Sequence, residues 1–153
     1  MTTNISEHFT LEEFYLSETA SQKKIDNSPP ISVIANLTKL AGVLEKVRAV
    51  LGQPIHINSG FRCLALNLAI SRAKTSSHMT GCAAYITSSK FGTPKEVIDA
   101  ILASGIRFHR IILEPSWVHI DISYEAANEG YDMMTLEAVF EPGKPVRYIP
   151  YKP

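Results

Sequence analysis

Two short segments of the chain carry the side chains best suited to chemistry. The first places His78 directly after a pair of serines, and the second offers Glu114 followed five residues later by His119. A catalytic zinc ion takes three protein ligands and keeps a fourth position for water, and a nearby carboxylate then accepts a proton from that water. The two histidines are therefore candidate zinc ligands and Glu114 is a candidate general base. Two distant histidines alone are weak evidence, because most histidines lie on the surface or are satisfied within a core.

Hydrophobic periodicity and turn residues predict the elements that must position these segments. Apolar residues at three- and four-residue steps predict a long amphipathic helix from Ser32 to Leu51. Thr93-Pro94 is a typical helix start, Ser104-Gly105 closes that helix, and residues 64–70 favour a shorter one. Short apolar or alternating runs predict strands at 54–59, 83–87, 110–114, 117–122 and, at the edge of a sheet, 146–150. Between these last two runs, the chain from Tyr124 onward is predicted to be loop-like.

The order of these elements indicates the fold class. Strands and helices mix without regular alternation, which favours an α+β fold with a small antiparallel sheet and flanking helices. The strands at 110–114 and 117–122 are separated only by Pro115-Ser116, so we expect them to form an antiparallel pair. The length of 153 residues is typical of a single domain, which we take to span residues 1–153.

Composition narrows the classes of partner. Fifteen basic and fifteen acidic residues give no net charge, which argues against a protein that works by neutralising nucleic-acid phosphates. No apolar run approaches the roughly 20 residues of a membrane span, and the N-terminus lacks the pattern of a signal peptide. We expect a protein made in the cytoplasm, either phage-encoded or carried to its target by another component. Cys63 and Cys82 are too few for a disulfide scaffold and are expected to be free thiols.

Three motifs in fixed order carry a resemblance to a known family. They are Ser59-Gly60-Phe61-Arg62, then Ser76-Ser77-His78-Met79-Thr80-Gly81 with Ala83-Ala84, and then Glu114 with Trp117-Val118-His119. This series resembles the peptidase M15 family, the zinc D-alanyl-D-alanine carboxypeptidase type that includes phage endolysins. The resemblance extends over at least residues 9–122, and it implies the fold of those carboxypeptidases.

The resemblance also implies roles for individual residues. His78 and His119 would bind Zn²⁺, and Glu114 would act as the general base. Arg62 would bind the C-terminal carboxylate of the substrate through its bidentate fork, and Ser76 would hydrogen-bond the peptide. The implied substrate is a peptidoglycan stem peptide or a related D-amino-acid peptide, and the implied activity is that of a zinc-dependent D,D- or L,D-peptidase.

One position departs from the family pattern at the heart of the site. Seven residues after the first histidine, where the family has an aspartate zinc ligand, the chain has Tyr85. A phenol is a poor zinc ligand because it is neutral near physiological pH. Alternate residues of a strand share a face, so Asp121 is expected on the face of His119 and is the candidate for a replacement ligand, although a strand-end or surface aspartate is the favoured interpretation. Cys82 is expected to face away from Tyr85.

Three hypotheses therefore remain open from the sequence. The chain is a zinc peptidase of cell-wall peptides with altered metal binding, or a catalytically inactive relative that binds peptidoglycan stems or another protein. The third is a purely structural component, such as a part of a phage particle. The retained residues His78, His119, Glu114, Arg62 and Ser76 favour chemistry or ligand binding, and Tyr85 favours the binding module.

Overall fold

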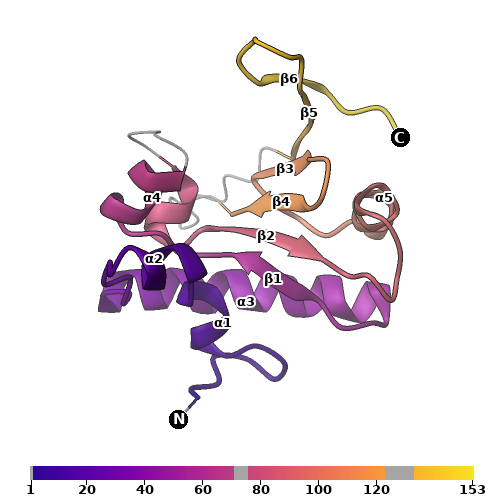
Figure 1. The fold of residues 1–153 in the computed structure, drawn as a ribbon. Helices are drawn as coiled ribbons and strands as arrows, with labels where there is room; N and C mark the ends of the chain where they lie inside the picture. The colour runs from indigo at the N-terminus through magenta and orange to yellow at the C-terminus, as the bar shows by residue number, and fades with distance from the viewer. Residues whose placement is uncertain (1, 71–75, 123–132) are drawn as a thin grey trace.

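The computed structural model describes residues 2–70, 76–122 and 133–153 and shows one six-stranded sheet (Figure 1). The strand order is β1-β2-β4-β3-β5-β6, and every neighbouring pair is antiparallel except β3 with β5, which is parallel. The strands are β1 (His56–Ser59), β2 (Ala83–Thr87), β3 (Arg110–Leu113), β4 (Val118–Asp121), β5 (Met134–Val139) and β6 (Arg147–Pro150). This arrangement confirms the predicted α+β fold.

Within the described residues, five α-helices and one 3-10 helix accompany the sheet, and the two longest follow the sequence signals closely. Gly52 ends the long helix in the left-handed conformation, with φ of 65°. Thr93 caps the next long helix through a capping box with Glu96. The helices are α1 (Leu11–Tyr15), α2 (Glu18–Gln22), α3 (Ile31–Leu51), α4 (Leu64–Ile70), α5 (Pro94–Ser104) and the 3-10 helix η1 (Ser77–Thr80).

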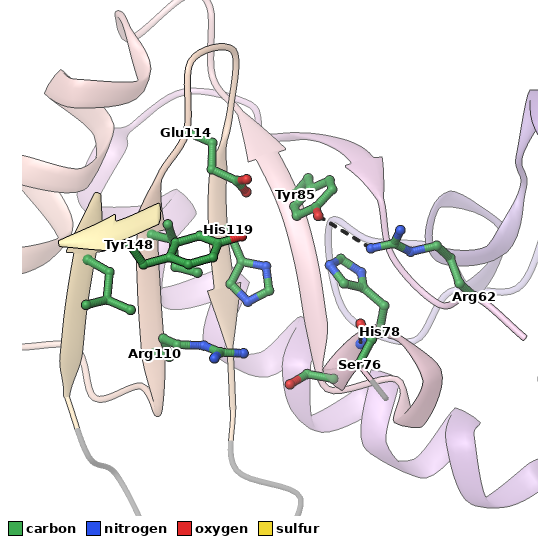
Figure 2. A pocket seen from close by; sticks show the side chains of 11 residues that line it. Arg62, Ser76, His78, Tyr85, Arg110, Glu114, His119 and Tyr148 are labelled. Atoms are coloured by element: carbon green, nitrogen blue, oxygen red, sulfur yellow. Dashed lines mark hydrogen bonds between the residues drawn. The ribbon is translucent and has the colours of Figure 1, made fainter. Parts of the chain in front are cut away.

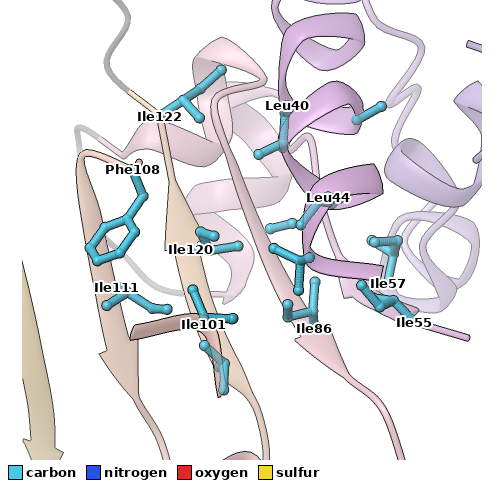
Figure 3. Close-up of a cluster of buried hydrophobic side chains, with 14 of the residues drawn as sticks. Leu40, Leu44, Ile55, Ile57, Ile86, Ile101, Phe108, Ile111, Ile120 and Ile122 are labelled. Atoms are coloured by element: carbon cyan, nitrogen blue, oxygen red, sulfur yellow. The ribbon is translucent and has the colours of Figure 1, made fainter. Parts of the chain in front are cut away.

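The core lies between the helices α3 and α5 and one face of the sheet (Figure 3). Leu40 and Leu44 of α3 are fully buried, as are Ile120 of β4 and Ile111 of β3. Each such side chain contributes about 1.5–3 kcal/mol by leaving water. Because neighbouring strand residues point to opposite faces, burying Ile120 fixes His119 on the other face. The hydrophobic core therefore determines which face of the sheet carries the polar side chains.

Several further predictions can be compared with the structure. The edge strand at 146–150 is confirmed as β6, and Cys63 and Cys82 are free thiols, as expected. The loop predicted from Tyr124 is wrong for residues 134–139, which form β5, and its first part, 124–132, lies outside the described residues. No helix within the described ranges has both the length and the apolar character needed to cross a membrane.

Candidate functional site

A small cavity opens on the face of the sheet that carries His119. Tyr85 lies opposite His119 in the neighbouring strand β2, and Ile112 of β3 lies opposite it on the other side, so these three side chains form one row. The cavity over this row has a volume of about 240 Å³. Its walls are formed by Arg62, Ser76, Ser77, His78, Tyr85, Arg110, Ile112, Glu114, His119, Leu136 and Tyr148 (Figure 2). The structure thus gathers all five retained residues of the sequence motifs around one cavity.

His78 is held in one tautomer by its surroundings. It lies in η1, where the Ser76 hydroxyl accepts a hydrogen bond from the His78 amide at 3.2 Å. Its Nδ1–H donates to the carbonyl oxygen of Gly60 at 2.8 Å, because a carbonyl oxygen only accepts. Nε2 therefore carries a lone pair, and it is buried without a hydrogen-bond partner in the described part of the chain. Burial, followed by the nearby Arg62 charge, lowers the pKa of His78 well below its ordinary value, so the ring is neutral.

His119 is engaged through one of its two ring nitrogens. Its Nε2 lies 2.6 Å from Oδ2 of Asp121, and the same oxygen accepts from Nε of Arg110 at 3.0 Å. Asp121 is completely buried and is not part of the cavity wall. The prediction that Asp121 shares a face with His119 is confirmed by their common strand register. The carboxylate nevertheless points at His119 and Arg110, so it orients the histidine and does not open on the cavity.

Tyr85 lies beside both histidines. Its ring stacks on Trp117, with centroids 4.9 Å apart and an angle of 21°, and its edge contacts His78 at a centroid distance of 4.6 Å. The Arg62 guanidinium lies 5.4 Å from the Tyr85 ring centroid, and its Nη2 donates to the phenol oxygen at a long 3.5 Å. Tyr85 is thus a packed member of an aromatic stack. Cys82 faces the other way, into the core, as predicted.

Among the described residues, Arg62 is a buried charged group of this site without a paired anion. It is only 3% exposed, its Nε has no hydrogen-bond partner, and no ion pair involves it in the described ranges. Its backbone is fixed because the Arg62 amide donates to the His78 carbonyl at 3.1 Å. Gly60, two residues earlier, packs so closely on helix α1 that an added Cβ would lie 2.5 Å from the Phe14 carbonyl oxygen. A buried guanidinium without a carboxylate is costly unless a ligand supplies an anion.

Glu114 follows β3 at the turn into β4. Its amide donates to the Trp117 carbonyl at 3.1 Å, which closes the turn over Pro115-Ser116. The indole Nε1–H of Trp117 donates to Glu114 Oε2 at 2.9 Å. Glu114 therefore has a fixed orientation at the wall of the cavity, where the family pattern places the general base.

The comparisons with known proteins agree with this arrangement. The model of the family described as Peptidase M15 matches residues 7–121, which is well over half of the 153 residues. The chain belongs to the peptidase M15 family. Peptidase M15 proteins are zinc-dependent peptidases in general and act on peptidoglycan peptides. No curated protein matches the chain.

The donor set of this M15 member does not fit the zinc of a catalytic centre. The lone pair of His78 Nε2 suits a metal, and the bond from His119 Nε2 to Asp121 leaves the lone pair of His119 on Nδ1, but a stacked phenol stands at the third position. Among the residues that the structure describes, no three histidine, cysteine or carboxylate side chains are grouped closely enough to hold a metal ion. A site with two imidazoles and a phenol lacks the anionic ligand that the family uses.

Sequence reasoning missed five residues of the cavity wall, which are Ser77, Arg110, Ile112, Leu136 and Tyr148. Arg110 could have been found, because it alternates with Ile112 and Glu114 along one strand and must share their face. Leu136 and Tyr148 come from β5 and β6, and β5 was not predicted as a strand. No local signal in the sequence connects these two residues with the histidines.

Proposed function

We propose that this M15 member binds the C-terminal end of a cell-wall stem peptide and does not cleave it through zinc. The observation that carries this proposal is the buried guanidinium of Arg62 in a small cavity, without an anionic partner in the described chain. A free carboxylate matches the planar fork of arginine in geometry and charge. The peptide's terminal carboxylate supplies that group.

The remaining wall suits a peptide next to this carboxylate. The neutral His78 presents a hydrogen-bond acceptor at Nε2, which suits an amide N–H of the ligand. Ser76 and Ser77 add hydroxyl groups on the same side. The volume of about 240 Å³ lies below the roughly 300–1,000 Å³ of pockets that enclose drug-sized molecules. The cavity therefore fits the small residues at the end of a stem peptide.

Hydrolysis by the family's route requires a metal-activated water. The donor set described above lacks the third ligand of such a site, which is the anionic one. A peptidase is favoured by the family match, by the free lone pair of His78 Nε2 and by Glu114, which lines the cavity and is held by Trp117. Without a metal-activated water whose proton it could accept, the Glu114 carboxylate serves to bind polar groups of the peptide. Cleavage of the peptide by protein supplied with zinc is therefore the rival outcome of the experiment.

The test is a calorimetric titration of chelator-treated protein with a synthetic stem pentapeptide ending in D-alanyl-D-alanine. We expect binding at one site, weaker binding of the peptide with an amidated C-terminus, and an intact peptide by mass spectrometry. Arg62→Gln should lose affinity about 10- to 100-fold, the effect of removing a charged hydrogen bond. Arg48→Gln, which removes the same charge from the last turn of α3, is the control and should bind normally. Equal binding of acid and amide would overturn the proposal.

A further inference from the structure

The wall of the cavity farthest from Arg62 comes from a part of the chain outside the family match. That match ends at residue 121, and strands β5 and β6 follow it. Strand β5 extends the sheet by pairing with β3, and β6 pairs with β5 at the sheet edge (Figure 1). Arg62 follows β1 at the opposite end of the strand order. The cavity therefore lies between a family motif and the β5–β6 hairpin.

Two side chains of this hairpin reach the cavity. Leu136 lies opposite Ile112 and so extends the row that contains His119. Tyr148 of β6 lies opposite Ala138 of β5. Its ring reaches across the sheet toward His119 (Figure 2). Partial burial, followed by the nearby carboxylate of Glu114, raises the pKa of Tyr148. The phenol therefore lies close enough to Glu114 to feel the charge of its carboxylate. The hairpin thus adds an apolar patch and an aromatic ring to the cavity.

Tyr148 has the properties of a contact residue for a ligand. It is 52% exposed although it lines a cavity, so part of its surface remains open for a ligand to cover. Its hydroxyl makes no hydrogen bond within the described segments. A tyrosine offers a large rigid surface with a polar tip, and for that reason it often dominates binding energy at recognition sites.

We propose that Tyr148 is a specificity-determining residue that packs on the ligand and limits the cavity to small, alanine-like side chains. This inference rests on the proposed peptide binding. With the terminal carboxylate at Arg62, the last side chains of the peptide lie over the row formed by His119 and Ile112. The ring of Tyr148 covers them from the hairpin. A branched side chain such as leucine meets this ring, and an alanine methyl group fits beneath it.

The test compares pentapeptides ending in D-alanyl-D-alanine and in D-alanyl-D-leucine. The unmodified protein should prefer the alanyl peptide. Tyr148→Ala should weaken binding of the alanyl peptide about three- to tenfold, the usual effect of losing an aromatic contact, and should bring the two peptides to similar affinity. Tyr148→Phe keeps the ring and should keep the preference. Phe140→Ala is the matched control, because Phe140 follows β5, is 54% exposed and does not line the cavity.

The outcomes separate this inference from the proposed function. An unchanged preference in Tyr148→Ala overturns the role of Tyr148, and if Arg62→Gln still loses affinity, the proposed peptide binding stands. Absence of binding to either peptide by the unmodified protein overturns both. A loss of preference in Phe140→Ala as well would assign the effect to the hairpin's stability and would contradict a specific contact of Tyr148.

Discussion

Replacing Tyr85 by aspartate tests whether Tyr85 stands at the position of the third zinc ligand. Aspartate at this position would stand beside His78 and opposite His119, and it restores the family's anionic ligand. The change also removes the stack with Trp117. Losing a fully buried aromatic side chain costs about 3–5 kcal/mol, and Tyr85 is only partly buried. We therefore expect a cost of about 2–3 kcal/mol for metal-free Tyr85→Asp.

Zinc should restore the lost stability of Tyr85→Asp and should not stabilise the unmodified protein. A ligand at 100 times its dissociation constant stabilises a protein by about 2.7 kcal/mol, which nearly cancels the expected cost. For a chain of this size, 1 kcal/mol corresponds to a change in melting temperature of about 2–4 °C. Tyr85→Asp should therefore melt about 5–10 °C below the unmodified protein without metal and return close to it with zinc.

The assay is thermal unfolding with and without zinc, together with elemental analysis of the purified variants. Tyr85→Asn is the matched control, since it removes the same stack but adds no charge, and it should gain no stability from zinc. The reasoning fails if Tyr85→Asp takes up no zinc, because Tyr85 would then not occupy the third ligand position. It also fails if the unmodified protein binds zinc with equal affinity and stoichiometry.

Three further predictions concern stability. Asp121→Asn should lower the free energy of unfolding by about 2–3 kcal/mol in urea, since it removes a buried charge paired with His119; a change below about 0.5 kcal/mol would match an ordinary surface site. The neutral His78 binds no proton where the unfolded histidine does, so stability should fall as pH drops below about 6.5. In His78→Gln the free energy of unfolding should depend less on pH between pH 7 and 5.5. An unchanged slope would contradict the role of His78 in this pH dependence. Gly60→Ala should cost at least about 2 kcal/mol in the same unfolding assay because its Cβ meets the Phe14 carbonyl; a stable variant would show that α1 can shift.

Local sequence signals sufficed for the elements that carry the motifs. The apolar stripe of α3 and the capping box of α5 are properties of short segments, and both helices lie where they were predicted. The alternation in 117–122 correctly placed Asp121 on the face of His119 and, by the same rule, turned Cys82 toward the core. Period and capping thus located the elements that carry the site, and the grouping of its residues was implied by the resemblance to the M15 family.

Contacts between distant segments could not be predicted in this way. Strand β5 is only partly buried, and it is fixed by parallel pairing with β3, more than twenty residues away. The position of Tyr85 was evident from motif spacing, but its stack with Trp117 depends on how two strands are aligned. Tyr148 reaches the cavity only through the β5–β6 pairing. These contacts decide whether the cavity holds a metal or a peptide end.

The central claim is that the cavity recognises a peptide carboxylate without a catalytic metal. The most direct measurement is the calorimetric titration of chelator-treated protein with the stem pentapeptide, followed by mass spectrometry of the mixture after zinc is added. The account predicts one binding site in the absence of metal and an intact pentapeptide afterwards. Binding that appears only with zinc, accompanied by release of the terminal residue, would contradict it.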